Sequence, residues 1–107
     1  GQSGVLPYGE STTPQSFTLP ESRQVSVLLK GTWLNSNGTE DPIEGRFLVE
    51  FIDGNGTVVA SSTGELYGED TVVTETLAAG TYTYVLHNEA TEMDLFDELP
   101  YDMWIYY

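Results

Sequence analysis

The sequence predicts an all-β protein built as an antiparallel β-sandwich, and three observations carry this expectation. Apolar and polar residues alternate with a period of two along most of the chain after Phe17, as in strands with one buried and one wet face. The alternating runs are rich in β-branched and aromatic residues, and turn residues interrupt them about every 8–12 positions. The 107 residues can bury one core without the disulfides that a chain lacking cysteine cannot form. We expect about seven to eight strands of jelly-roll or immunoglobulin-like arrangement.

Seven short runs are expected to form the strands. None keeps a helical period long enough to favour a helix, and a loop or one helical turn is expected in NEATEMDLFDELP. Turns are expected at residues 35–38, 53–56, 64–68 and 79–80, where Gly, Asn and Asp gather. In chain order the runs read SFTL, QVSVLLKGTW, RFLVEFID, TVVAS, DTVVTETL, TYTYVLH and DMWIYY.

The alternation also divides the side chains of each run between two faces. In the last run, Met103, Ile105 and Tyr107 share one face, and Trp104 and Tyr106 share the other. If the first of these faces the core, Trp104 and Tyr106 are exposed. The apolar faces of the earlier runs are Val25, Val27 and Leu29; Phe47, Val49 and Phe51; and Tyr82, Tyr84 and Leu86.

The stretch DGNGTVVA, which begins at Asp53, has the oxygen-rich composition of a calcium loop. An EF-hand loop places Gly at its sixth position and Glu at its twelfth, but here those positions hold Val58 and Gly64. Asn-Gly between two alternating apolar runs is instead the strongest short signal for a hairpin. We therefore expect a turn between two strands.

Two segments are expected along the chain. Residues 1–15 are rich in Gly, Pro, Ser and Thr, so they are expected to form a flexible N-terminal arm or linker, and residues 16–107 form the sandwich. Val5, Leu6 and Tyr8 are the apolar anchors of the arm. An extended arm can add to an exposed sheet edge, so self-association through residues 1–15 is one alternative and a disordered linker is the other.

The charge of the chain excludes several classes of partner. Seventeen acidic residues face three basic ones, which gives a formal net charge of -14. Nucleic acid is excluded as a partner, because its binding needs Lys and Arg to replace counterions. The same charge favours solubility, divalent cations and basic partners. No apolar run approaches the ~18 residues of a membrane span.

Calcium is the expected cofactor, because it takes six to eight oxygen ligands and two stretches are dense in carboxylates. Loops at one end of a sandwich can converge on a shared site, and a cation there would relieve the repulsion between acids. Solvated loop charges are the alternative. The candidate ligands are Glu40, Asp41 and Glu44 in the first stretch, and Glu89, Glu92, Asp94, Asp97, Glu98 and Asp102 in the second.

No catalytic site is expected. The single histidine, His87, ends a predicted strand, and no G-x-S-x-G motif offers a serine nucleophile. A lone histidine at a strand end is usually a surface residue. One histidine and no cysteine also make a zinc site improbable.

Aromatic residues suggest a carbohydrate ligand as a further alternative. Trp104 and Tyr106 share one face of the last predicted strand, where their rings could stack on sugars. Packing in the core is the alternative fate for a tryptophan in a small sandwich.

The element L-x-A-G-T-Y, from Leu77 to Tyr82, follows a D-G-N-G turn and an acidic Gly-containing stretch. Together with the opening FTLPESRQVSVLL, this order resembles the bacterial pre-peptidase C-terminal domains from about Phe17 to Tyr107. It is also similar to the β-sandwich module of calpains. Either resemblance implies a non-catalytic accessory sandwich. The first implies secretion beside a hydrolase and calcium held by loops, and the second implies regulation through acidic loops.

These observations predict a non-catalytic accessory or binding module that is extracellular or at the cell surface. Its expected partner is a protein or carbohydrate ligand, and its acidic loops are expected to bind calcium. The alternative is a structural subunit of an extracellular assembly, such as a filament or surface layer, joined through its N-terminal arm.

Overall fold

A computed structural model gives the fold for residues 1–30, 32–34, 40–42, 44–67, 71–89 and 99–107. The described residues form ten β-strands and no helix, which confirms the predicted all-β class. None of these residues therefore belongs to a helix able to cross a membrane. The strands are β1 (Gln2–Leu6), β2 (Gln15–Leu19), β3 (Arg23–Lys30), β4 (Thr32–Leu34), β5 (Glu40–Pro42), β6 (Glu44–Asp53), β7 (Val58–Tyr67), β8 (Thr71–Leu77), β9 (Gly80–Asn88) and β10 (Leu99–Tyr106).

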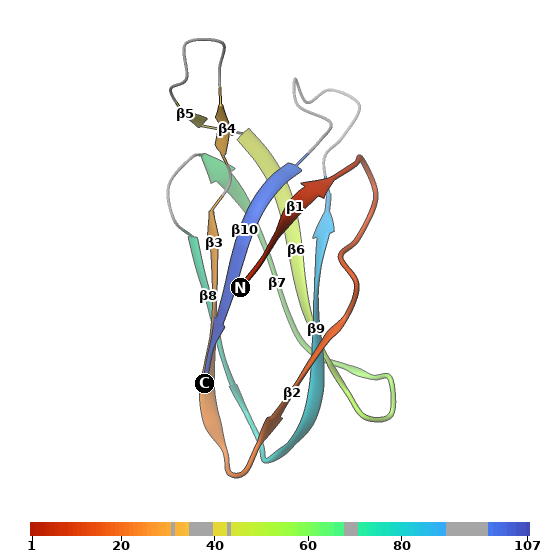
Figure 1. The fold of residues 1–107 in the computed structure, drawn as a ribbon. Coiled ribbons are helices and arrows are strands. Elements are labelled where there is room, and N and C mark those ends of the chain that lie inside the picture. Colours follow the sequence, from red (N-terminus) through yellow and green to blue (C-terminus); the bar gives the residue numbers. More distant parts are fainter. Residues whose placement is uncertain (31, 35–39, 43, 68–70, 90–98) are drawn as a thin grey trace.

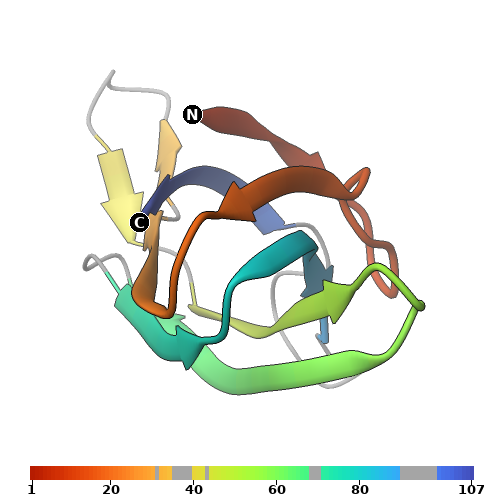
Figure 2. The ribbon, with the colours of Figure 1, turned by 90° about the horizontal axis from the view of Figure 1, so that it is seen from below.

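Eight of the strands form a sandwich of two antiparallel sheets (Figures 1 and 2). Sheet A has the order β1-β10-β3-β8, and sheet B has the order β2-β9-β6-β7. The short strands β4 and β5 pair only with each other and form a hairpin at one end of the sandwich (Figure 1). With that hairpin set aside, the chain passes between the sheets in the order of a jelly roll, one of the two arrangements that the sequence suggested.

The core lies between the two sheets and follows the predicted alternation. The inward face of β3 is fully buried at Val25, Val27 and Leu29. The predicted apolar faces of β6 and β9 are buried as well, and Met103 of β10 is completely enclosed. Because side chains alternate strictly in a strand, burial of Met103 turns Trp104 and Tyr106 to the solvent.

Phe17 of β2 is the centre of an aromatic cluster within this core. Burial of Tyr84, and to a lesser degree the neighbouring Tyr107, raises the pKa of the Tyr84 hydroxyl. Tyr107 is half exposed and still reaches the cluster with its ring. The ring centroids nearest to that of Phe17 belong to Tyr107 at 5.3 Å, Tyr82 at 5.7 Å, Tyr84 at 6.0 Å and Phe51 at 6.3 Å.

The N-terminal segment differs from the flexible arm that the sequence suggested. Residues Gln2–Leu6 form β1, which pairs with β10 in a continuous register from Gln2↔Met103 to Leu6↔Leu99. Leu6 is 6% exposed and belongs to the core, whereas Val5 and Tyr8 are about half exposed. The sandwich therefore begins near residue 2 and not at residue 16.

The connection from β1 to β2 is fixed to β9 by hydrogen bonds. The buried Asn88 side chain donates from Nδ2 to the carbonyl of Leu6 at 3.0 Å, and its backbone N–H donates to Glu10 at 2.9 Å. Two further bonds join Thr12 and Leu86: the Thr12 N–H donates to the Leu86 carbonyl, and the Leu86 N–H donates to Thr12 Oγ1. These contacts satisfy backbone groups that a loose arm would leave to water.

The stretch at Asp53 forms a hairpin turn, as expected. One carboxylate oxygen of Asp53 accepts hydrogen bonds from the backbone N–H groups of Asn55 and Thr57, at 2.9 and 3.0 Å. Gly56 has a φ of 81°, which a residue without a side chain adopts readily. The Asp53 side chain thus shapes the turn between β6 and β7.

The turn expected at residues 64–68 is wrong for residues 64–67, because β7 continues through Gly64 to Tyr67. The ring of Phe47 lies directly over this glycine, and a Cβ atom there would approach the ring to 2.9 Å. Gly64 is therefore a place of close packing inside a strand. The turn expected at residues 35–38 lies outside the described residues.

Candidate functional site

The outer face of sheet A presents a row of apolar side chains across three neighbouring strands. Trp104 of β10 lies opposite Leu28 of β3, and Leu28 lies opposite Val72 of β8. Tyr106 is two residues further along β10 on the same side. We call these four residues the aromatic face. Val72 and Tyr106 are more than half exposed and Trp104 is 36% exposed, so the row is open to a ligand.

Polar side chains flank the aromatic face along both of its sides. On one side Asp102 of β10 lies between Ser3 of β1 and Lys30 of β3 in the register of the sheet. On the other side Ser26 lies opposite Tyr106, and its hydroxyl is 3.1 Å from that of Thr74. An apolar strip between polar margins can bind a ligand that has both apolar and hydroxyl-bearing surfaces.

A cavity of about 220 Å³ opens beside the indole of Trp104. We call it the Trp104 cavity, and Gly1, Gln2, Ser3 and Asp102 form the rest of its lining. The side-chain oxygen of Gln2 is buried and has no hydrogen-bond partner within the described part of the chain. Gln2 lies opposite the buried Met103 in the β1–β10 register, so its side chain is on the core side of the sheet and not on the face that carries Trp104.

His87 is not the isolated surface residue that the sequence suggested. Its Nδ1 is in hydrogen-bond contact with the hydroxyl of Ser11, and its Nε2 is in contact with the carboxylate of Glu50. The His87 Nε2 atom and the Glu50 carboxylate are close enough for an ion pair, but they are not aligned for a hydrogen bond. The three residues come from the segment before β2, from β9 and from β6.

The Ser11–His87–Glu50 arrangement has the residue types of a hydrolytic triad. Such a triad also needs a substrate cavity beside the nucleophile. The Trp104 cavity is formed by other residues, and so is a second cavity of about 480 Å³ lined by Arg46, Glu65 and Glu89 with their neighbours. The observed contacts connect the N-terminal segment to two strands of sheet B.

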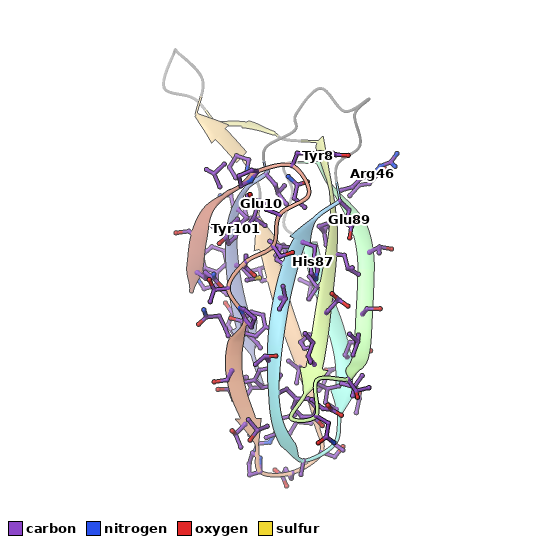
Figure 3. The ribbon with its side chains drawn as sticks, turned by 90° about the vertical axis from the view of Figure 1, so that its right-hand side faces the viewer. Tyr8, Glu10, Arg46, His87, Glu89 and Tyr101 are labelled. Carbon is purple, nitrogen blue, oxygen red and sulfur yellow. The ribbon has the colours of Figure 1, made fainter. Side chains whose placement is uncertain are left out.

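The strands that flank the two acidic stretches end together. β5 and the start of β6 lie at the same end of the sandwich as the end of β9 and the start of β10 (Figure 1). Glu89 is exposed there, and its backbone N–H donates to the carbonyl of Arg46 at 2.9 Å. Figure 3 shows Tyr8, Arg46 and Glu89 near this end. Residues 35–39 and 90–98, between these strand ends, lie outside the described residues, so the approach of the two acidic stretches stays a prediction.

Besides Glu89, four of the candidate calcium ligands lie within the described residues, at two places in the fold. Asp102 lies on the outer side of β10 and lines the Trp104 cavity. Glu40 and Asp41 belong to β5, and Glu44 is the first residue of β6. Within the described residues, no three His, Cys, Asp or Glu side chains are grouped closely enough to hold a metal ion. The candidates outside the described residues are Glu92, Asp94, Asp97 and Glu98.

Part of the aromatic face is predictable from the sequence and part of it is not. Trp104 and Tyr106 were found by the period of two. Leu28 and Val72 were missed, although each stands directly before a second apolar residue, and such a pair places one apolar side chain on each face. Gln2 and Ser3 were missed because their segment was assigned to a flexible arm.

Comparison with known proteins gives a likeness of fold. No family model and no curated protein matches the chain. It is similar to the crystal structure of a protein from Sulfurospirillum deleyianum, with a TM-score of 0.51 and 12% sequence identity. The match covers 99% of this chain and 97% of that one. It supports the sandwich fold over the whole length and carries no statement about function.

Proposed function

We propose that this chain is a non-catalytic binding module that attaches to carbohydrate through the outer face of sheet A. The observation that carries the proposal is the row of exposed Trp104, half-buried Leu28 and exposed Val72, with exposed Tyr106 beside it. Flat aromatic rings stack on the apolar C–H faces of sugars, and the polar margins of the row can bind the hydroxyl groups. The four side chains lie on paired strands, so the surface is held rigidly before a ligand arrives.

Two other ligands of an aromatic surface fit the chain less well. Nucleobases also stack on aromatic rings, but single-stranded nucleic acid needs a positively charged groove. With three basic residues against seventeen acidic ones, the chain repels a phosphate backbone. A second copy of the chain would bring the same net charge of -14 against itself. An uncharged carbohydrate is not repelled by the negative charge of the chain.

Replacing Trp104 by Ala is the direct test of this proposal. We expect the affinity for a soluble neutral glycan, such as mixed-linkage β-glucan or galactomannan, to fall about tenfold to a hundredfold, as for loss of a central aromatic contact. Affinity electrophoresis and titration calorimetry measure the change, and thermal melting checks that the variant is folded. Tyr106→Ala should act in the same direction.

Tyr8→Ala is the matched control, because Tyr8 is a half-exposed aromatic residue away from this face. Its removal should leave glycan binding unchanged. Equal losses in Trp104→Ala and Tyr8→Ala would contradict a role for the aromatic face, and so would a wild-type chain that binds no glycan in the panel.

Calcium binding by the acidic end of the sandwich is the second part of the proposal. Its support is the meeting of the strand ends that flank residues 35–44 and 88–99. A module of this kind acts outside the cell or at the cell surface, where calcium is plentiful and polysaccharides are accessible.

We expect Ca²⁺ to raise the melting temperature of the chain more than NaCl of equal ionic strength does. A cation that binds only the folded state adds roughly 2.7 kcal/mol at a hundredfold excess over its Kd. For a domain of this size, each kcal/mol corresponds to about 4–8 °C. Equal shifts with the two salts would instead indicate general screening of the acidic charge and would contradict a specific calcium site.

A further inference from the structure

We propose that β7 accepts an extended, positively charged segment of a partner protein, which adds to the edge of sheet B as a fifth strand. The inference goes beyond the proposed function, since it concerns the opposite sheet and a protein ligand. The residues that carry it run from Ala60 to Tyr67, and we call them the β7 edge.

The β7 edge is the longest strand edge without a strand beside it in the part of the chain that the structure describes. β7 is the last strand of sheet B and pairs with β6 on one side only. After a bulge at Val59, beside the turn, the register is unbroken from Ala60 to Tyr67. Figure 2 shows β7, in green, at the margin of the molecule. Since every second residue of such a strand directs its backbone groups away from its neighbour, the edge presents a row of donors and acceptors.

The other three edges of the two four-stranded sheets carry features that discourage strand addition. β1 and β2 have five residues each, and β2 lies between Pro14 and Pro20. β8 has seven residues, and its Glu75 lies opposite the buried Val25, so the Glu75 side chain is on the core side. Short strands, prolines and inward-pointing charges are known protections of sheet edges. β7 has ten residues, no proline and a single charged residue, Glu65.

The side chains of the β7 edge indicate the pattern of the incoming strand. Ala60 lies opposite the buried Phe51, which places it on the core-facing side of β7. Ser62 and Gly64 are on the same side, and all three residues are half-buried and small. Apolar side chains of an added strand would cover this margin of the core. The partner segment therefore alternates apolar residues on the core-facing side with polar residues on the outer side.

Charge determines which segments can approach the β7 edge. Seventeen acidic residues against three basic ones attract a cationic segment and repel an acidic one, including a second copy of this chain. Within β7, Glu65 already lies 3.6 Å from Arg46 of the neighbouring β6. Backbone hydrogen bonds supply the affinity of strand addition for many sequences. The preference for a basic partner thus comes from the charge of the whole chain.

The test uses the full chain and three synthetic peptides as long as the β7 edge. One alternates Val and Lys, and one alternates Val and Glu. The third is the Val-Lys peptide with every backbone amide N-methylated, which keeps the charge but has no backbone N–H donor. We expect fluorescence anisotropy at low ionic strength to show binding of the first peptide alone. Its binding should slow amide hydrogen exchange at alternate residues of β7 and leave exchange in β1, β2 and β8 unchanged.

Thr63→Lys adds a positive charge at an exposed position of the β7 edge. We expect it to weaken binding of the Val-Lys peptide about fivefold, because like charges then face each other across the strand pair. Thr76→Lys is the matched control, since it makes the same change at an exposed threonine of β8, the edge of the other sheet. It should bind like wild type, and thermal melting checks that both variants are folded.

Several results would overturn the proposal. Equal losses in the two lysine variants, or binding of the N-methylated peptide, would show attraction to the net charge without strand addition. Equal binding of the Val-Glu peptide would remove the preference for a basic partner. Absence of peptide binding would overturn the proposal as well. Dimers in sedimentation velocity that Thr63→Lys alone dissociates would assign the β7 edge to a second copy of the chain and overturn the partner proposed here.

Discussion

Phe17→Ala is expected to lower the free energy of unfolding by about 3–5 kcal/mol, the range for loss of a large buried aromatic side chain. Phe17 is 5% exposed, and within the described residues its ring lies against four others: Phe51 of β6, Tyr82 and Tyr84 of β9, and the half-exposed Tyr107. Its removal leaves a cavity at the place where the two sheets meet. Urea unfolding followed by tyrosine and tryptophan fluorescence measures the change.

Thr18→Ala is the matched control for this prediction. Thr18 is the next residue of the same strand, its side chain is exposed, and its hydroxyl lies 3.1 Å from that of Thr81. Substitutions at such surface positions usually change stability by about 0.5 kcal/mol or less. If the two substitutions had similar effects, the assignment of Phe17 to the core and the orientation of β2 would both be wrong.

Leu6→Ala is the second substitution with a large expected effect, a loss of about 2–5 kcal/mol. Leu6 is buried at the end of β1, opposite Leu99 of β10. Its neighbour Val5 is 49% exposed, so Val5→Ala should change stability by about 0.5 kcal/mol or less. Thermal and urea unfolding of the two variants make the comparison within a single strand.

Deletion of residues 1–10 extends the same prediction to the whole segment. The deletion removes Leu6 from the core and removes the acceptors that Asn88 uses, so the shortened chain should be strongly destabilised. A flexible arm would predict unchanged stability for the deletion and for Leu6→Ala alike. An assembly subunit would show concentration-dependent oligomers that disappear with the deletion, which sedimentation velocity can detect.

The sequence predicted the sandwich because alternate residues of its central strands enter the core. In β3, β6 and β9 each second residue enters the core, so burial imposes the period of two directly on the sequence. The hairpin at Asp53 was also predictable, since its geometry depends on local residues alone: a carboxylate that accepts two backbone N–H groups, and Gly56 with positive φ.

β1 could not be predicted in the same way. An edge strand in this position buries a single large side chain, Leu6, and its other residues remain partly or fully exposed. The strand is held by pairing with β10, which is about a hundred residues away in the chain, and by the bonds from Asn88. These are long-range contacts, and a segment with Gly, Ser and Pro carries no local pattern that reveals them.

The candidate site also has one part that the sequence predicts and one part that only the fold brings together. The exposure of Trp104 and Tyr106 follows from alternation within β10, and the sequence is sufficient for it. The polar lining of the Trp104 cavity follows from the register that brings Ser3 beside Asp102, which only the fold provides. Asp102 illustrates the difference, since its charge suggested a calcium ligand and its position in the sheet makes it part of the carbohydrate site proposed here.

Mapping of backbone amide chemical shifts during titration with a soluble neutral glycan tests the central claim most directly, because it locates the bound ligand on the chain. We expect shifts to concentrate on the residues of β10, β3 and β1 around Trp104, Leu28 and Ser3, with little change in β6 and β7 of sheet B. Shifts confined to sheet B or to the acidic end of the sandwich, or no shifts at saturating glycan, would contradict it.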